Sequence, residues 1–157
     1  NIVQFGGHKY AAGLTIKEEN YDLFKQSFEK AVSKYVKNNL PKQEIIIESQ
    51  IKLASITSKF YRILNQFEPF GPGNRTPVFF SKGLSLNGKL NMIGKNKEHI
   101  KFSVNQESKN SFSAIGFWLS EKCNKIKANE DFSMAYTIDQ NTWNGNTTIQ
   151  LKIKDIK

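Results

Sequence analysis

Residues 99–105, HIKFSVN, alternate polar and apolar side chains without a break. Residues 149–154, IQLKIK, show the same alternation. A period of two is typical of a β-strand that buries one face and exposes the other. These two stretches therefore predict that the second half of the chain is built from strands around an apolar core.

Further strand candidates lie between and around these two stretches, separated by Gly, Asn, Lys and Ser. Together the candidates are residues 78–81, 84–93, 99–105, 112–118, 132–139 and 147–156. Asn144-Gly145 is typical of a two-residue hairpin turn before the last strand, and residues 120–127 suit one short helix. Five or six antiparallel strands of this length predict a small closed barrel such as the OB fold, with a small β-sandwich as the alternative.

The first part of the chain has a helical period. Residues 2–5 are expected to end a strand, and Gly6-Gly7-His8 to form a sharp turn that exposes its backbone. Thr15 and Glu18 stand at capping-box spacing and predict a helix that runs to about Val36 and ends over residues 38–41. Its apolar stripe, which we expect to face the core, consists of Tyr21, Phe24, Phe28, Ala31 or Val32, and Tyr35.

The middle of the chain predicts a strand, a helix and a domain boundary. Residues 44–51 contain three consecutive isoleucines and predict a short buried strand. Residues 58–67 predict a second helix, with one apolar side formed by Phe60, Ile63, Leu64 and Phe67. Residues 68–77 hold three prolines and two glycines, which are typical of a boundary. The expected fold is α+β, with residues 1–67 in one domain, 68–77 as the junction and 78–157 as the barrel.

The 157 residues carry a net charge of +9. Residues 1–75 hold eleven basic and seven acidic side chains, and residues 76–157 hold twelve and seven, so folded segments share the charge. A basic surface favours nucleic acid as partner, with an anionic membrane surface or plain solubility as alternatives. No apolar run approaches the roughly 18 residues of a membrane span. A single cysteine fits a reducing cytoplasm, and a chain that starts at Asn1 is expected to be a fragment.

The sequence lacks the residues for a metal-dependent catalytic centre. It has two histidines and four scattered aspartates, whereas a two-metal phosphoesterase needs several such ligands together. No nucleophile-elbow motif is present. We therefore expect neither a bound metal nor a complete catalytic site in this chain.

Residues 6–13, GGHKYAAG, resemble the signature of the DHH-associated domain of DHH-family phosphoesterases. Residues 68–74, EPFGPGN, followed by 77–79, PVF, resemble the junction between this domain and the OB domain in RecJ-type exonucleases of bacteria. Residues 99–101, 114–117, 141–145 and 151–156 are similar to that family in order and spacing. The resemblance covers nearly the whole chain.

The resemblance implies the C-terminal part of an α/β DHH-associated domain followed by an antiparallel OB-like barrel. Gly6, Gly7 and His8 would help to hold the substrate phosphate. The metal-binding DHH domain would precede this segment, so the intact protein would be a Mn²⁺- or Mg²⁺-dependent exonuclease that degrades single-stranded DNA from the 5′ end in repair and recombination. Its expected partners are single-stranded DNA, the DHH domain, and repair proteins such as a helicase or a single-strand-binding protein.

The barrel itself predicts a surface for single-stranded DNA, because OB folds combine basic side chains with aromatic rings that stack on bases. The nucleic-acid-binding candidates are Arg75, Lys82, Lys95, Lys97, Lys101, Trp143 and Lys152. Phe79, Phe102, Phe117 and Trp118 are the other aromatic candidates, most of which we expect in the core. Two alternatives stay open: a phosphodiesterase of oligoribonucleotides or cyclic dinucleotides, and an OB module that binds proteins.

Overall fold

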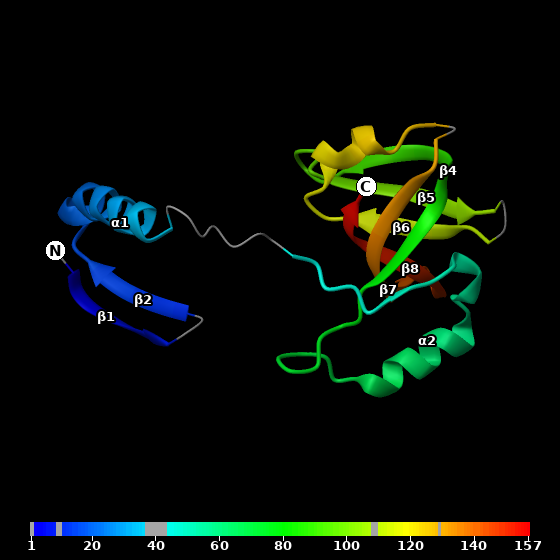
Figure 1. The fold of residues 1–157 in the computed structure, drawn as a ribbon, viewed down its shortest axis with the longest axis horizontal. Helices are drawn as coiled ribbons and strands as arrows, with labels where there is room; N and C mark the ends of the chain where they lie inside the picture. Colours follow the sequence, from blue (N-terminus) through cyan, green and yellow to red (C-terminus); the bar gives the residue numbers. More distant parts are fainter. Residues whose placement is uncertain (1, 9–10, 37–43, 108–109, 129) are drawn as a thin grey trace. The chain divides into compact units, whose positions relative to one another are not determined.

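The computed structural model describes residues 2–8, 11–36, 44–107, 110–128 and 130–157. The chain divides into two compact units, Asn1–Glu44 and Ile45–Lys157 (Figure 1). Each unit is considered by itself below.

The first unit is a two-stranded hairpin followed by a helix. Strands β1 (Ile2–His8) and β2 (Ala11–Ile16) are antiparallel, and the 3₁₀ turn η1 (Glu18–Asn20) leads into α1 (Tyr21–Val36). The helix is confirmed, but no side chain caps η1, so the expected capping box is absent there. The expected end of the helix at residues 38–41 lies outside the described residues.

Gly6-Gly7-His8 does not form the predicted turn. All three residues lie within β1, where Gly7 pairs with Ala12 and His8 with Ala11. A Cβ atom on Gly7 would lie 2.7 Å from the Cα of Ala12, so a close approach of the two strands requires this glycine. Gly7 therefore serves strand packing rather than a change of chain direction.

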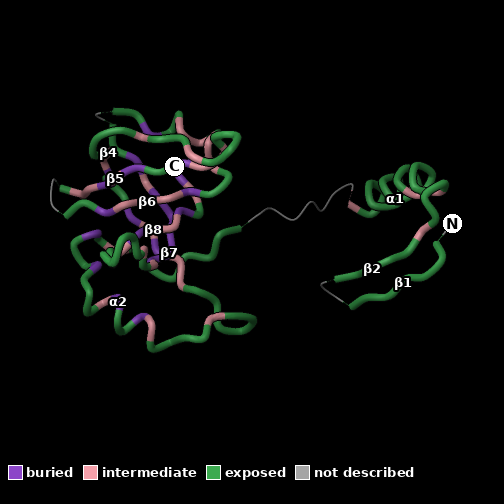
Figure 2. Tube along the Cα trace, turned by 180° about the vertical axis from the view of Figure 1, so that it is seen from behind, coloured by how far each residue is buried: buried purple, intermediate pink, exposed green. Residues whose placement is uncertain are grey.

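The apolar stripe of α1 is not a core in this unit. None of the described residues of the first unit is buried (Figure 2). Phe28 is 57% exposed and Tyr35 is 90% exposed, although the rings of Phe24 and Phe28 stack at 5.6 Å. One hairpin and one helix have too little surface between them to enclose a row of aromatic side chains.

The second unit is a β-barrel preceded by short elements whose apolar side chains join its core. Its elements are β3 (Ser49–Gln50), η2 (Leu53–Ser55), α2 (Ser58–Leu64), η3 (Asn65–Phe67), β4 (Phe79–Ile93), β5 (His99–Gln106), β6 (Phe112–Gly116), η4 (Ser120–Lys125), β7 (Phe132–Trp143) and β8 (Asn146–Ile156). The strand order is β3-β4-β5-β6-β8-β7, and β7 also pairs with β4. This second pairing closes the sheet, as the OB fold requires.

Two details of the sheet differ from the predicted antiparallel barrel. Strands β6 and β8 are parallel to each other, and the short strand β3 is parallel to β4. The candidates 78–81 and 84–93 form one long strand, β4, whose register shifts after Ser81 and after Asn87. These irregularities bend β4, so that its first part pairs with β7 and its second part with β5.

The alternating residues of the barrel are buried as predicted. Ile100, Phe102 and Val104 lie in the core, as do Leu151 and Ile153 on β8 (Figure 2). Asn144 and Gly145 both have positive φ, at 47° and 78°, which confirms the hairpin turn between β7 and β8.

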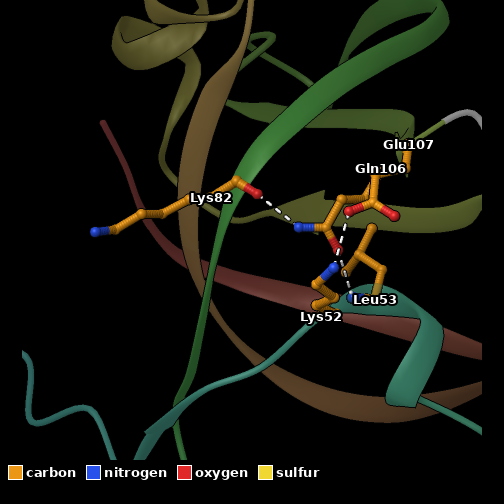
Figure 3. Close-up of polar contacts among 5 residues, drawn as sticks. All are labelled: Lys52, Leu53, Lys82, Gln106 and Glu107. Atoms are coloured by element: carbon orange, nitrogen blue, oxygen red, sulfur yellow. Dashed lines mark hydrogen bonds and ion pairs between the residues drawn. The ribbon is translucent and has the colours of Figure 1, made fainter.

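Residues 45–67 belong to the barrel unit, so the boundary between compact units does not fall at residues 68–77. Leu53, Ile56, Tyr61 and Leu64 join the barrel core. The side chain of Gln106 on β5 accepts a hydrogen bond from Leu53 N at 2.8 Å and donates one to Lys82 O at 2.6 Å (Figure 3). The N-terminal elements are thus tied to two barrel strands by both apolar and polar contacts.

The segments around α2 also depart from the sequence predictions. The three isoleucines at 45–47 are exposed, because regular pairing with β4 is limited to Ser49 and Gln50. Tyr61 and Leu64 of α2 are buried, whereas Ile63 of α2 and Phe67 of η3 are exposed. Residues 68–77 form a loop within the unit, in which the Asn74 amide donates to the carbonyls of Phe67 and Pro69.

Candidate nucleic-acid interface

The outer face of β5 carries a band of polar side chains across three strands. On β5, Lys101 and Ser103 alternate with the buried Ile100 and Phe102, so they point away from the core. The band contains Asn87, Lys89, Asn91, Lys101, Ser103 and Ser113, which line one shallow hollow. The register explains this grouping: Asn91 on β4 and Ile115 on β6 both pair with Lys101. We call this surface the β5 face.

The loop between β4 and β5 presents Lys95 and Lys97 at one end of the β5 face, and both residues are exposed. The Glu98 carboxylate accepts the backbone N–H of Asn96 at 2.8 Å, and Lys97 N donates to Gly94 O at 3.2 Å. Backbone N–H donation by Glu98 itself and by Asn96 lowers the pKa of this carboxyl against the opposing effect of desolvation, and nearby His99 adds to the lowering. The ionised carboxylate therefore holds together the loop that carries the two lysines.

Three aromatic rings meet beside this loop. The His99 ring lies 5.1 Å from the Phe117 ring and 4.9 Å from the Trp118 ring, both edge to face. Trp118 N donates a hydrogen bond to Nδ1 of His99 at 3.1 Å. The next turn is joined to the loop, because Ser120 N donates to Glu98 O at 3.3 Å. The basic loop and the aromatic cluster are therefore neighbours at one end of the barrel.

Trp143 lies at the other end. The parallel pairing of β6 with β8 places Ile115, three residues before Trp118, beside Lys152, whereas Trp143 pairs with Asn146 at the start of β8. Six residues, or about 20 Å along β8 at about 3.3 Å per residue, separate these two levels. The two tryptophans are each 74% exposed.

The remaining predicted lysines and Arg75 are spread around the barrel. Lys152 lies next to Ile115 in the register, and its ammonium forms an ion pair with Asp139. Lys82 is exposed on β4 with its Nζ 5.8 Å from the centroid of the Phe80 ring. Arg75 is exposed in the loop before β4. The structure thus gathers Lys95, Lys97 and Lys101 but does not group Arg75, Lys82 or Trp143 with them.

The aromatic candidates divide into core and surface. Phe79 and Phe102 are buried, whereas Phe117, Trp118 and Trp143 are exposed, so the expectation that most of these rings lie in the core is wrong. Sequence reasoning chose Trp143 first because it flanks a turn, and it named Trp118 only among the other aromatic candidates. Its proximity to His99 depends on the pairing of β5 with β6, which the local sequence does not reveal.

The predicted phosphate-binding residues lie in the first unit. Gly6, Gly7 and His8 are exposed along β1, and His8 ends that strand. Lys9 and Tyr10 of the same motif lie outside the described residues. The β5 face and this motif belong to separate compact units.

In the described ranges, no group of three or more His, Cys, Asp or Glu residues is placed to hold a metal ion. Over the same residues, no helix has the length and apolar character needed to cross a membrane.

Comparisons with known proteins match the whole chain. The RecJ OB domain family model matches residues 47–155. The single-stranded-DNA-specific exonuclease RecJ of Bacillus subtilis is 28% identical over 158 residues, covering 98% of this chain and 19% of that protein. The protein of the same name from Salmonella typhimurium is 26% identical over 156 residues, covering 99% of this chain and 26% of that protein.

The fold is also similar to a solved structure. The crystal structure of RecJ in complex with Mn²⁺ from Thermus thermophilus matches with a TM-score of 0.66 and 21% identity, covering 99% of this chain and 22% of that one. The chain therefore spans about a quarter or less of the length of these relatives.

Proposed function

The chain belongs to the RecJ OB domain family, and from this membership we propose that it holds single-stranded DNA for an exonuclease specific for that substrate. The observation that carries the proposal is the β5 face, a polar hollow with Lys89 and Lys101 beside a loop that presents Lys95 and Lys97. Strands two and three of an OB barrel, with the loops between strands one and two and between strands four and five, form the usual oligonucleotide surface. Here those elements are β5, β6, residues 94–98 and the β7–β8 hairpin at residues 143–146.

The chemistry of this face supports nucleic acid over the two alternatives. Ammonium groups neutralise phosphates, and hydroxyl and amide groups such as those of Ser103 and Asn91 donate hydrogen bonds without restricting the sequence that is bound. An apolar, uncharged face would have favoured a protein partner. A short oligoribonucleotide or cyclic dinucleotide needs no strand-binding barrel beside its catalytic centre.

The proposal extends to the intact enzyme. We propose that this chain is its C-terminal part and that the enzyme degrades DNA from the 5′ end in repair and recombination, in a bacterial cytoplasm. A helicase and a single-strand-binding protein are the proposed partners. Exposed Gly6, Gly7 and His8 would contact a phosphate at the cleft with the DHH domain.

Divalent metal ions do not fit the described residues of this chain, which bring together no cluster of ligands. We place Mn²⁺ or Mg²⁺ in the DHH domain of the intact enzyme. This chain alone is proposed to bind DNA without cleaving it.

The test is an anisotropy titration of a labelled oligothymidylate of about 16 nucleotides, the upper site size of an OB fold, with the 157-residue chain. Binding should weaken steeply with added salt, because each neutralised phosphate releases a counterion. A duplex of equal length should bind more weakly, since its bases are not open to the face. Absence of binding at low salt, or binding that salt does not change, would contradict the proposal.

A further inference from the structure

We propose that Trp118 is a base-stacking platform for single-stranded DNA and that Lys95 and Lys97 bind the adjoining phosphates. This inference rests on the proposed function and assigns one end of the barrel to a base. The observation behind it is a bulky exposed indole that is fixed in an unfavourable backbone conformation beside an ordered basic loop.

The backbone of Trp118 is held in place at a cost. Its φ is +58°, in the left-handed region that residues other than Gly, Asn and Asp rarely adopt. The hydrogen bond to Nδ1 of His99 and the edge-to-face contact of the two rings hold the residue there. Strained residues of this kind cluster at ligand-binding sites, where the surrounding contacts maintain them.

The ring that this backbone projects is open to a ligand. Trp118 is 74% exposed, while Phe102 on β5 is buried. Phe117 is half exposed, and both Phe117 and Trp118 pack against the His99 ring, so an apolar surface surrounds the indole. Every nucleobase has a π-face, and stacking on such a ring does not depend on base identity.

Basic side chains lie on the loop next to this ring. Lys95 and Lys97 are exposed on the loop whose residue Glu98 is bonded to Ser120. Lys101 lies one row farther along the β5 face, opposite Asn91. A chain of nucleotides with one base on Trp118 would therefore meet ammonium groups at its adjoining phosphates.

Trp143 provides an internal comparison. It is as exposed as Trp118 but lies at the tip of the β7–β8 hairpin, and residues 140–150 contain no lysine or arginine. Among the described residues, no ring contact or side-chain hydrogen bond fixes its indole. These are the two tryptophans of the chain, so replacing one leaves a single tryptophan at a known end of the barrel.

The experiment titrates the same oligothymidylate into Trp143→Phe and Trp118→Phe and follows tryptophan fluorescence. Trp143→Phe, which retains Trp118, should be quenched as the base stacks, and Trp118→Phe should be nearly unchanged. An oligomer of abasic nucleotides with equal charge should bind without quenching, because it offers phosphates but no base.

Affinity gives the second readout. Trp118→Ala should weaken binding by about 5- to 150-fold, the range that loss of one stacked base produces. Trp143→Ala, the matched comparison, should weaken binding less than Trp118→Ala does. Thermal unfolding of both variants verifies that the barrel remains folded.

The possible outcomes separate the two proposals. Quenching in Trp118→Phe alone would overturn the assignment to Trp118, although DNA binding would stand. Equal quenching of both phenylalanine variants, together with equal affinity losses in the two alanine variants, would overturn it in the same way. Quenching by the abasic oligomer would also overturn it, since the indole would then respond to phosphate binding. If the wild-type chain binds no oligomer at low salt, the proposed function itself fails and this inference fails with it.

Discussion

Trp118 N donates a hydrogen bond to Nδ1 of His99 at 3.1 Å, across the end of the β5–β6 pair. The acceptor role of Nδ1 means that a proton on the neutral imidazole sits on Nε2. Nε2 lies 3.8 Å from a Glu98 carboxylate oxygen. One histidine thus links the loop that carries the lysines to the indole that we propose as a platform.

Replacement of His99 should show that it positions Trp118. His99→Ala removes both the acceptor and the ring contact, so the left-handed Trp118 should relax and DNA affinity should fall by about 1 kcal/mol, a typical value for one hydrogen bond. His99→Asn should retain part of the affinity, because its Oδ1 can accept near the position of Nδ1. Both variants are compared by anisotropy and by the fluorescence emission of Trp118 in a Trp143→Phe background. Equal losses in the two variants would assign the effect to the ring alone.

Gly94 should be more sensitive than Gly88 to substitution by alanine. The two glycines have φ values of +99° and +85°, so each alanine carries a similar backbone strain of about 1 kcal/mol. A Cβ on Gly94 would also lie 2.7 Å from the Glu98 carboxylate, whereas nothing lies within 4 Å of one on Gly88. Displacing that carboxylate from Asn96 N should lower the free energy of unfolding further in Gly94→Ala.

Urea unfolding of Gly94→Ala and Gly88→Ala measures this difference. DNA affinity should also fall in Gly94→Ala, because the loop that presents Lys95 and Lys97 loses its internal bonds. Equal unfolding midpoints for the two variants would mean that the Glu98 side chain moves aside without cost.

Much of the barrel could be predicted from the sequence, because its signals are local. The alternation in residues 99–105 and 149–154 reports which face is buried, and Asn144-Gly145 supplies the positive φ values of the hairpin. The parallel pairing of β6 with β8 is not local, since the two strands are joined through η4 and β7. The bend in β4 was also missed, because residues 82–83 look like a break between strands rather than a bulge within one.

The candidate site was predicted only in its charges. Lys95, Lys97 and Lys101 were chosen for their place in the barrel sequence, and the register brings them together. Trp118 was named only among the aromatic candidates, because its contact with His99 on β5 is not visible in the local sequence. The apolar stripe of α1 was assigned to a core that the described residues of the first unit do not form. A period shows that a face is apolar, but it does not show what covers that face.

Neutralising Lys101 on the β5 face, or Lys95 on the loop beside it, should change the salt dependence of binding. Lys95→Gln and Lys101→Gln should each lower affinity and reduce the slope of log K against log salt by about 0.7, the value expected for one phosphate contact on a single strand. Lys59→Gln is the matched control, since Lys59 is exposed on α2 and its replacement removes the same charge. An equal slope change in the control would show that net charge, rather than this face, attracts the DNA.

The buried pair of Tyr136 and Ser81 should make barrel stability fall in strong base. Ser81 Oγ donates to Ile51 O at 2.7 Å, so the Tyr136 hydroxyl donates to Ser81 Oγ at 2.8 Å. Burial raises the pKa of Tyr136 to about 12, against the opposing effect of its hydrogen bond with Ser81. The folded chain therefore keeps a proton that the unfolded chain loses near pH 10, and the stability linked to this group is present below about pH 10 and lost as pH rises toward 12.

Tyr136→Phe isolates this effect from the other groups that titrate in base. Near pH 8 the variant should be about 1 kcal/mol less stable than the wild-type chain, because it lacks one buried hydrogen bond. The wild-type chain should then lose about 1.4 kcal/mol by about pH 11, one pKa unit above the value for the unfolded chain, and the variant should not. The difference in unfolding free energy, measured with urea at both pH values, should therefore shrink to about zero near pH 11 and change sign above it. A difference that stays constant from about pH 8 to 11 would contradict a neutral, proton-retaining Tyr136 in the core.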